Sequence, residues 1–200
     1  MADPAVAGPA ADPVASARAL VKDAAGMRQL GGRLAGLLRP GDLVVLAGPL
    51  GAGKTTLVQG IGDGLDVRGP VTSPTFVIAR VHPSLRGGPD LVHADAYRLG
   101  SRLEVDDLDL DADLDHSVTV VEWGEGLVEN LAPGYLLISI AWAGPGDPGQ
   151  QGPAVVAGPP VPQPPGDEPR AVTVLGYGGR WAGQSGDLRA AVAPPGTARL

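Results

Sequence analysis

The chain has 200 residues, of which 44% are hydrophobic and none is cysteine, and it carries a formal net charge of −7 at pH 7. This length suits one domain with a core of its own, and the lack of cysteine excludes a disulfide framework and a cysteine-ligated zinc site. The acidic balance argues against a surface dedicated to nucleic acid. No basic segment leads into an apolar run at the N-terminus, and no apolar stretch approaches membrane-spanning length. We therefore expect a cytoplasmic location and no membrane partner.

The first part of the chain predicts an extension, a strand and a helix. Residues 1–16 are rich in Ala, Pro, Gly and Asp without a hydrophobic period, and we expect them to be disordered. Residues 17–21 suit a short edge strand. Apolar side chains then recur at three- and four-residue steps through residues 23–38, which predicts a helix with Asp23 as its N-cap. Three glycines are each expected to weaken this helix by about 1 kcal/mol relative to alanine: Gly31, Gly32 and Gly36.

The stretch 48–55 reads G-P-L-G-A-G-K-T, which matches the phosphate-binding pattern G-x-x-x-x-G-K-[ST]. The apolar run 42–47 before it is typical of a buried strand, and residues 55–65 after it predict an amphipathic helix. The glycines let the backbone turn its N–H groups onto phosphate oxygens, and the helix N-terminus adds the positive end of its dipole. We expect Lys54 to reach the β- and γ-phosphates and Thr55 to place its hydroxyl on a magnesium ion.

Downstream of this loop, polar turns alternate with β-rich runs. We expect strands at residues 76–80, 91–95, 117–123, 135–142 and 170–177. The last two strands are predicted to pair as a hairpin across a Pro/Gly-rich insert, residues 143–169, which we expect to be disordered. The acidic stretch 104–115 suits two short helical turns, and residues 124–131 suit a short helix.

Strands that alternate with helices around a phosphate loop indicate the α/β class. The prediction is a P-loop NTPase sandwich with a mostly parallel sheet and antiparallel strands at the C-terminal side. We expect a single domain over residues 17–181. The pattern after it is weak, so residues 182–200 are predicted to be a tail with one helical turn around Leu188.

Two acids follow apolar runs and are candidates for the second magnesium ligand and for activating water. They are Asp95 and Glu122, and the cleaner strand before Glu122 places it first; the alternative for each is a cap on the next turn. Ser73 and Thr75 lie where a switch-like loop would touch the γ-phosphate, or else form a plain Ser-Pro turn. His93, inside an alternating strand, is more often a packed and hydrogen-bonded side chain than a catalytic base.

The sequence contains four motifs in this order: G-P-L-G-A-G-K-T-T at 48–56, T-S-P-T-F at 72–76, H-A-D-A-Y-R-L at 93–99 and V-E-W-G-E at 121–125. Their combination resembles the TsaE family, the small bacterial P-loop ATPases required for threonylcarbamoyladenosine formation in tRNA. The resemblance runs from about residue 17 to residue 142, with a weaker match through residue 181.

The resemblance implies that the chain binds ATP with Mg²⁺ and hydrolyses it slowly on its own. It implies work with homologues of TsaB and TsaD, the pair that transfers the threonylcarbamoyl group to the adenosine next to the anticodon. The chain would not perform that transfer and would meet tRNA only through the complex, which its ATP turnover would reset between cycles.

Carried over residue by residue, the resemblance and the motifs assign catalytic roles to Glu122, Lys54 and Asp95, and magnesium contacts to Thr55, Asp95 and Glu122. The nucleotide contacts fall on Gly48, Leu50, Gly51, Ala52, Gly53, Lys54, Thr55, Thr56, Ser73, Thr75 and Trp123.

Three features depart from the family pattern. Pro49 stands where the family commonly has Asp, at a position that the general pattern leaves variable. Ala94 and Ala96 replace bulkier residues on either side of Asp95, which is expected to loosen that strand end. The insert 143–169 and the N-terminal extension are additions that do not touch the nucleotide site.

Two other functions remain open at this point. A small P-loop kinase or GTPase is one alternative, although the sequence has no Asn-Lys-x-Asp motif for guanine and few arginines between Lys54 and Trp142 to form a lid. The second is a non-catalytic subunit that senses ATP, against which the two candidate acids argue.

Overall fold

The computed structural model describes residues 12–74, 78–99, 104–105, 114–143 and 168–194. Its strands are β1 Ala15–Val21, β2 Leu43–Ala47, β3 Ala79–His82, β4 Asp90–Asp95, β5 Ser117–Glu122, β6 Tyr135–Trp142 and β7 Arg170–Tyr177. Its α-helices are α1 Ala24–Ala35, α2 Lys54–Leu65 and α4 Ser185–Val192. Three short 3₁₀ helices are η1 Leu114–His116, η2 Glu129–Leu131 and η3 Gly179–Trp181.

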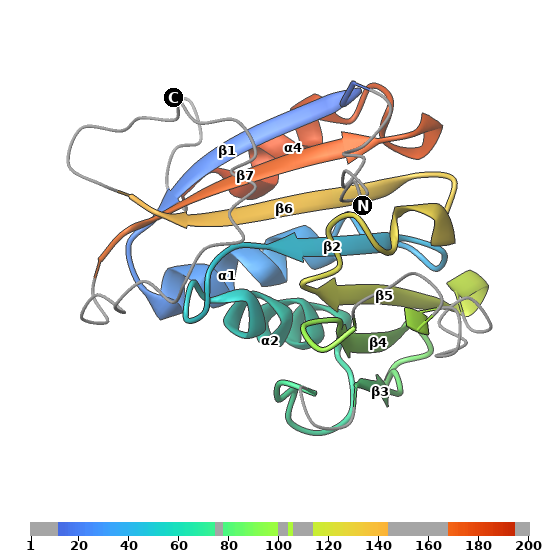
Figure 1. Ribbon diagram of the computed structural model, residues 1–200. Coiled ribbons are helices and arrows are strands. Elements are labelled where there is room, and N and C mark those ends of the chain that lie inside the picture. The colour runs from blue at the N-terminus through green and yellow to red at the C-terminus, as the bar shows by residue number, and fades with distance from the viewer. Residues whose placement is uncertain (1–11, 75–77, 100–103, 106–113, 144–167, 195–200) are drawn as a thin grey trace, which may run out of the picture.

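The described strands form one seven-stranded sheet in the order β1-β7-β6-β2-β5-β4-β3 (Figure 1). The four central strands, β6, β2, β5 and β4, run parallel to one another. At one side β7 pairs antiparallel with β6 and β1 antiparallel with β7, and at the other side β3 pairs antiparallel with β4. The α/β fold class is confirmed. Among the described strands the sheet is evenly mixed, because three of the pairings between neighbours are antiparallel and three are parallel.

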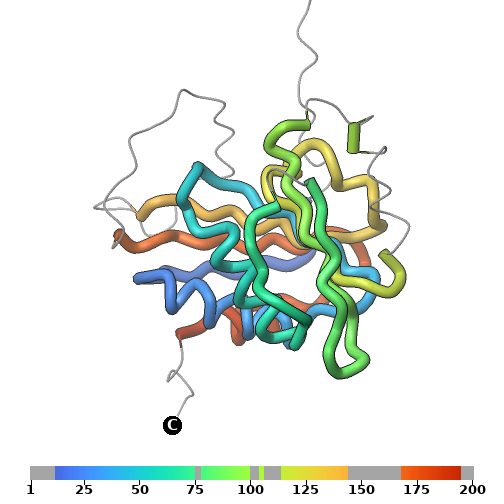
Figure 2. The backbone as a smooth tube through the Cα atoms, turned by 90° about the horizontal axis from the view of Figure 1, so that it is seen from below, coloured from blue at the N-terminus to red at the C-terminus, as the bar shows by residue number. Residues whose placement is uncertain are grey.

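Strand β2 lies in the middle of the sheet and all five of its residues are buried. Such burial on both faces requires a continuous apolar run, and the sequence L-V-V-L-A supplies it. One face packs against α1, α2 and α4, and Figure 2 shows α1 and α4 on the same side of the strands. The opposite face is covered by side chains from the connections around β5, including Val105, Val128 and Leu131.

Helices α1 and α2 approach each other closely enough that their backbones meet. A Cβ atom added at Gly31 would lie 2.3 Å from the carbonyl oxygen of Leu57, and one added at Gly60 would lie 2.0 Å from that of Arg28. Two of the three helix-weakening glycines behave differently: Gly31 is needed for this contact, whereas a Cβ at Gly32 would meet nothing closer than 3.7 Å. The expected N-cap is present, since the Asp23 carboxylate accepts the Gly26 N–H at 2.7 Å.

The two ends of the domain extend further than the sequence predicted. Strand β1 begins at Ala15, which is buried, so the boundary expected at residue 16 is too late. The expected tail 182–200 contains α4, whose Leu188 is fully buried, and the weak pattern is a consequence of its eight-residue length. Residues 124–131 form only the 3₁₀ helix η2 rather than a helix along their whole length.

The hairpin prediction agrees with the register: Tyr135 pairs with Tyr177, and Trp142 with Arg170. Most of the insert, Thr75 of the switch-like loop and most of the acidic stretch lie outside the described residues. None of the helices in the described part of the chain combines the length and apolarity needed to cross a bilayer.

Candidate functional site

The glycine-rich stretch 48–53 joins the C-terminal end of β2 to the N-terminus of α2. Gly48 has a φ of 135°, and a Cβ there would lie 2.2 Å from the carbonyl oxygen of Ile140 on β6, so only glycine fits. Gly53, the N-cap of α2, has a φ of 108°, and no side chain among the described residues caps the helix. The backbone N–H groups of the first turn therefore lack an intrahelical acceptor and suit an anion such as phosphate.

Lys54 begins α2 and its side chain is buried, with 4% of the residue exposed. Its Nζ donates to the carbonyl oxygens of Gly48 at 2.8 Å and Pro49 at 3.0 Å, and it lies 3.5 Å from the centroid of the Trp123 ring. Burial lowers the pKa of Lys54 to about 8, although the charges of Glu122 and Asp95 oppose that shift. The ammonium group thus rests on the loop that it is expected to help close around phosphate.

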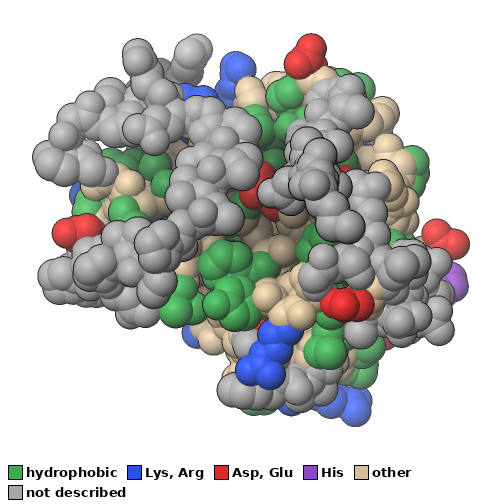
Figure 3. All heavy atoms as spheres, viewed as in Figure 1, with side chains coloured by type: hydrophobic (Ala, Val, Ile, Leu, Met, Phe, Trp, Pro, Cys, Tyr) green, Lys and Arg blue, Asp and Glu red, His purple; other side chains and the backbone are tan. Residues whose placement is uncertain are grey.

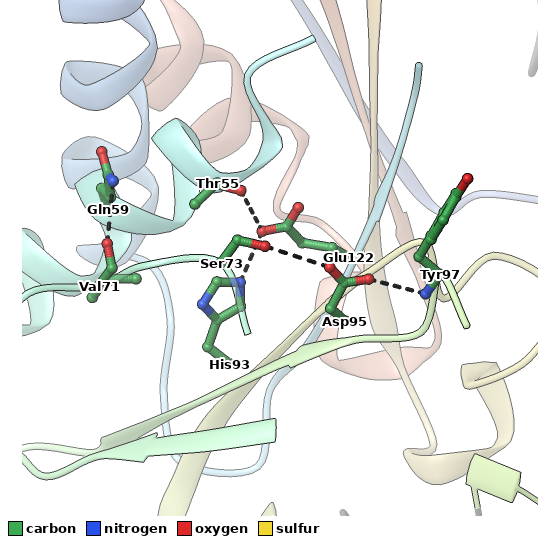
Figure 4. A network of polar contacts seen from close by, with 8 residues as sticks. All are labelled: Thr55, Gln59, Val71, Ser73, His93, Asp95, Tyr97 and Glu122. Carbon is green, nitrogen blue, oxygen red and sulfur yellow. Dashed lines mark hydrogen bonds and ion pairs between the residues drawn. The ribbon is translucent and has the colours of Figure 1, made fainter. Parts of the chain in front are cut away.

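The two candidate acids stand side by side because β4 and β5 are parallel and in register, with Asp95 opposite Glu122. Figure 4 shows the Glu122 carboxylate at the N-terminus of α2, where Thr55 Oγ1 donates to Glu122 Oε1 at 2.8 Å, with the Asp95 carboxylate next to it. Both acids are buried, at 5% and 3% exposed. The ends of two strands and one helix therefore bring a hydroxyl and two carboxylates into one place.

The carboxylate of Asp95 is held by different groups. Its Oδ1 accepts the backbone N–H of Tyr97 at 2.9 Å, and Ser73 Oγ lies 3.5 Å from its Oδ2, at the limit of a hydrogen bond (Figure 4). Asp95 thus does cap the turn that follows it, as the alternative interpretation held, and it also faces Ser73 of the switch-like loop. Thr75 lies outside the described residues.

Trp123 follows Glu122 directly and adopts a φ of 62°, which is uncommon for a residue other than glycine. Its backbone N–H donates to the carbonyl of Leu46 at 2.9 Å, which ties this turn to the end of β2. The Tyr97 ring, 63% exposed, lies 5.2 Å from the Trp123 ring. Sequence reasoning did not single out Tyr97, although it stands inside the motif at 93–99.

A small pocket of about 70 Å³ lies between the start of α1 and the phosphate loop. Its lining includes residues from α1, the phosphate loop and the start of β7: Asp23, Ala24, Met27, Gly51, Ala52, Gly53, Thr56 and Arg170. Of the predicted nucleotide contacts, Gly51, Ala52, Gly53 and Thr56 line this pocket, whereas the Leu50 side chain is 67% exposed. The sequence did not predict that Arg170 lines this pocket, because no local signal links the start of β7 to the phosphate loop.

No group of three or more His, Asp or Glu side chains in the described residues is arranged to hold a metal ion. Thr55, Asp95 and Glu122 instead offer one hydroxyl and two carboxylates beside an uncapped helix N-terminus. Mg²⁺ is usually bound by one or two carboxylates together with substrate phosphates and water. These residues therefore fit a metal ion that arrives with a nucleotide.

Comparison with known proteins identifies relatives of this arrangement. A model of the family described as "Threonylcarbamoyl adenosine biosynthesis protein TsaE" matches residues 21–146. A Streptomyces coelicolor protein named tRNA threonylcarbamoyladenosine biosynthesis protein TsaE is 59% identical over 157 residues, covering 78% of this chain and 94% of the relative. A Mycobacterium tuberculosis protein of the same name is 55% identical over 114 residues, covering 54% and 68%.

Among solved structures, YdiB of Bacillus subtilis superposes with a TM-score of 0.64 at 26% identity, covering 89% of this chain and 97% of that one. The match therefore extends over most of both chains. Together with the family match over most of the chain, this likeness leads to one conclusion: the chain belongs to the TsaE family.

Proposed function

We propose that this chain binds ATP with Mg²⁺, hydrolyses it slowly on its own, and drives a cycle of threonylcarbamoyladenosine modification of tRNA. One observation carries the proposal: Lys54 and Thr55 of a P-loop face Glu122 and Asp95 in a member of the TsaE family. Relatives that are 59% and 55% identical to this chain over the matched residues are named for tRNA threonylcarbamoyladenosine biosynthesis.

The residues divide the work as follows. Lys54 exchanges the carbonyls of Gly48 and Pro49 for phosphate oxygens, and the first-turn N–H groups of α2 add their partial positive charge. The magnesium ion, when bound with the nucleotide, neutralises charge that develops on the phosphates. Thr55 and the carboxylates of Asp95 and Glu122 would hold that ion, and Glu122 would orient the attacking water.

The charge distribution supports a role inside a protein complex. The net charge of −7 disfavours direct binding to the negatively charged tRNA. On the face drawn in Figure 3, the described Lys and Arg side chains lie in separate places rather than in one continuous stripe. We therefore propose that homologues of TsaD and TsaB hold the tRNA and carry out the transfer. In this proposal the chain works in the cytoplasm and resets their complex between cycles.

The nucleotide chemistry is tested by ATP turnover and ATP binding of the purified chain and two variants. Lys54→Ala is expected to abolish ATP-dependent function, because the phosphates lose their positive partner. Glu122→Ala is expected to leave ATP binding largely intact and to stop hydrolysis. GTP competition against labelled ATP identifies the preferred base.

Asp115→Ala is a matched control, because Asp115 is exposed in η1, at the opposite end of β5 from Glu122. It should hydrolyse ATP like the parent chain. Full hydrolysis by Glu122→Ala would show that the wrong acid has been chosen. A parent chain that neither binds nor hydrolyses ATP would overturn the nucleotide proposal.

A further inference from the structure

His93 is the most deeply buried titratable side chain that contacts the candidate site. The residue is 0% exposed, lies on β4, and points from the strand toward Glu122 (Figure 4). Its Nε2 is 2.9 Å from Glu122 Oε1. A buried imidazole loses its hydrogen bonds to water, so the partner that it keeps is informative about its role.

We propose that His93 is a positioning residue that holds the Glu122 carboxylate in its working orientation, an inference that rests on the proposed ATP hydrolysis. In the structure, Glu122 Oε1 receives two donors, Thr55 Oγ1 at 2.8 Å and His93 Nε2 at 2.9 Å. No described residue donates to the other oxygen, Oε2. The contacts therefore give the two oxygens separate tasks, with Oε1 held by the protein and Oε2 left for the reaction site.

The chemistry of the pair fixes the proton on one ring nitrogen. An ionised carboxylate only accepts hydrogen bonds, so His93 donates to it through a protonated Nε2. The other nitrogen, Nδ1, is buried and has no hydrogen-bond partner among the described residues. An unprotonated Nδ1 leaves only an acceptor unpaired, so the contacts favour Nε2 as the nitrogen that donates. The single hydrogen bond that the ring makes there is directed at Glu122.

This arrangement matters because Thr55 is assigned a second task. Its hydroxyl oxygen would contact a magnesium ion through a lone pair while its O–H stays available to Glu122, so the Thr55 contact depends on where the metal ion draws the hydroxyl. His93 is a second donor on Oε1 that lies outside the proposed metal contacts. Strand β4 also supplies Asp95 two residues later on the same face, since side chains alternate along a strand. One strand thus carries one acid of the site and the group that holds the other acid.

Two variants separate positioning from packing. His93→Gln places an amide N–H close to the position of Nε2, whereas His93→Leu fills similar space without a donor. We expect His93→Leu to lower ATP turnover by roughly 10- to 100-fold, the usual loss for a group that orients a metal-site carboxylate. Its affinity for ATP should change much less than its turnover, and His93→Gln should recover most of the turnover.

Equal turnover in His93→Leu and the parent chain, or equal losses in His93→Leu and His93→Gln, would overturn the proposal. Thermal unfolding of each variant shows whether it has folded.

A measurement without nucleotide decides the contact independently of activity. ¹⁵N chemical shifts of the His93 ring in the parent chain should show Nε2 protonated and Nδ1 unprotonated, and Glu122→Ala should change them. A protonated Nδ1 with a bare Nε2 would contradict the inference even if every variant lost turnover. A parent chain with the expected tautomer but no ATP hydrolysis would overturn the proposed function while leaving the contact in place.

Discussion

For Lys54, the sequence predicts where the residue lies but not which groups its side chain contacts. The G-K-T pattern predicted its place at the start of α2 and its direction toward phosphate. Its contacts in this structure, with two carbonyl oxygens of its own loop and the face of Trp123, were not predictable. They depend on the positive φ of Trp123, which places its ring at the loop. No local signal in the sequence predicts that backbone conformation.

Burial of Lys54 leads to a prediction about pH. The pKa of this amine is lowered to about 8 from its ordinary 10.5, so the unfolded chain binds more protons than the folded chain between these values. The stability of the nucleotide-free protein should therefore gain from this group as pH rises from about 8 toward 10.5. Phosphate favours the charged amine, so ATP binding should weaken above pH 8, by at most tenfold per pH unit.

Titration of a fluorescent ATP analogue at pH 7 to 9.5 measures this dependence. Lys54→Met, which cannot titrate, is the control, and its weak residual binding should lack the fall above pH 8. An affinity of the parent chain that stays constant across this range would show that Lys54 does not lose its proton there.

Glu122 was ranked above Asp95 because a cleaner apolar strand precedes it, and the structure places its carboxylate against Thr55. Glu122 reaches Thr55 because of the order of the strands in the sheet, which patterns in a single sequence do not give. Strand β5 lies next to β2, with Glu122 opposite Leu46, whereas β4 lies one strand further from the phosphate loop. His93 was interpreted as a packed and hydrogen-bonded side chain, but its partner could not be named from the sequence because Glu122 lies on a neighbouring strand.

At the scale of elements, the packing of α1 against α2 supports the helix that follows the phosphate loop. Sequence patterns located both helices from their apolar steps and the Asp23 cap. They treated the α1 glycines as weak points, because helix propensity is local and a helix–helix contact is not. In the structure, the backbones meet at Gly31 and Gly60, and the Arg28–Asp63 ion pair spans the same two helices.

Gly31→Ala and Gly32→Ala form a matched pair of substitutions in α1. Each gains up to about 1 kcal/mol of helix propensity. A Cβ at Gly31 would collide with backbone atoms of α2, so we expect a net loss of about 1–3 kcal/mol there. A Cβ at Gly32 has room, so that variant should unfold at the same temperature as the parent or slightly higher. Equal melting temperatures for the two variants would contradict the backbone contact.

At the scale of the whole molecule, the C-terminal segment with β7 and α4 is part of the core rather than a tail outside it. The strand pattern of residues 170–177 was strong enough to predict the β6–β7 hairpin across a long insert. Helix α4 was predicted only as one turn around Leu188, because eight residues offer too few apolar steps, yet it packs on β1 and α1. Arg33 Nε donates to the carbonyl oxygen of Ala191 at 2.6 Å and joins α1 to the end of α4.

Leu188→Ala tests the contribution of α4 to the domain. Leu188 is 0% exposed in the core beneath the sheet, so its truncation should cost about 2–5 kcal/mol of unfolding free energy. The neighbouring exposed Arg189→Ala should stay within about 0.5 kcal/mol of the parent chain. Denaturant unfolding measures both values. A Leu188→Ala variant as stable as Arg189→Ala would show that α4 is dispensable.

The central claim is that ATP turnover at the Lys54–Glu122 site drives repeated cycles of tRNA modification. The most direct test is multiple-turnover threonylcarbamoylation of tRNA by TsaB and TsaD with the threonylcarbamoyl-adenylate donor. The reaction is run with the chain, without it, and with Lys54→Ala. We predict that rounds of product beyond the first require the intact chain and ATP. Equal turnover with and without the chain, while it still binds ATP, would contradict the account and leave an ATPase whose client is another process.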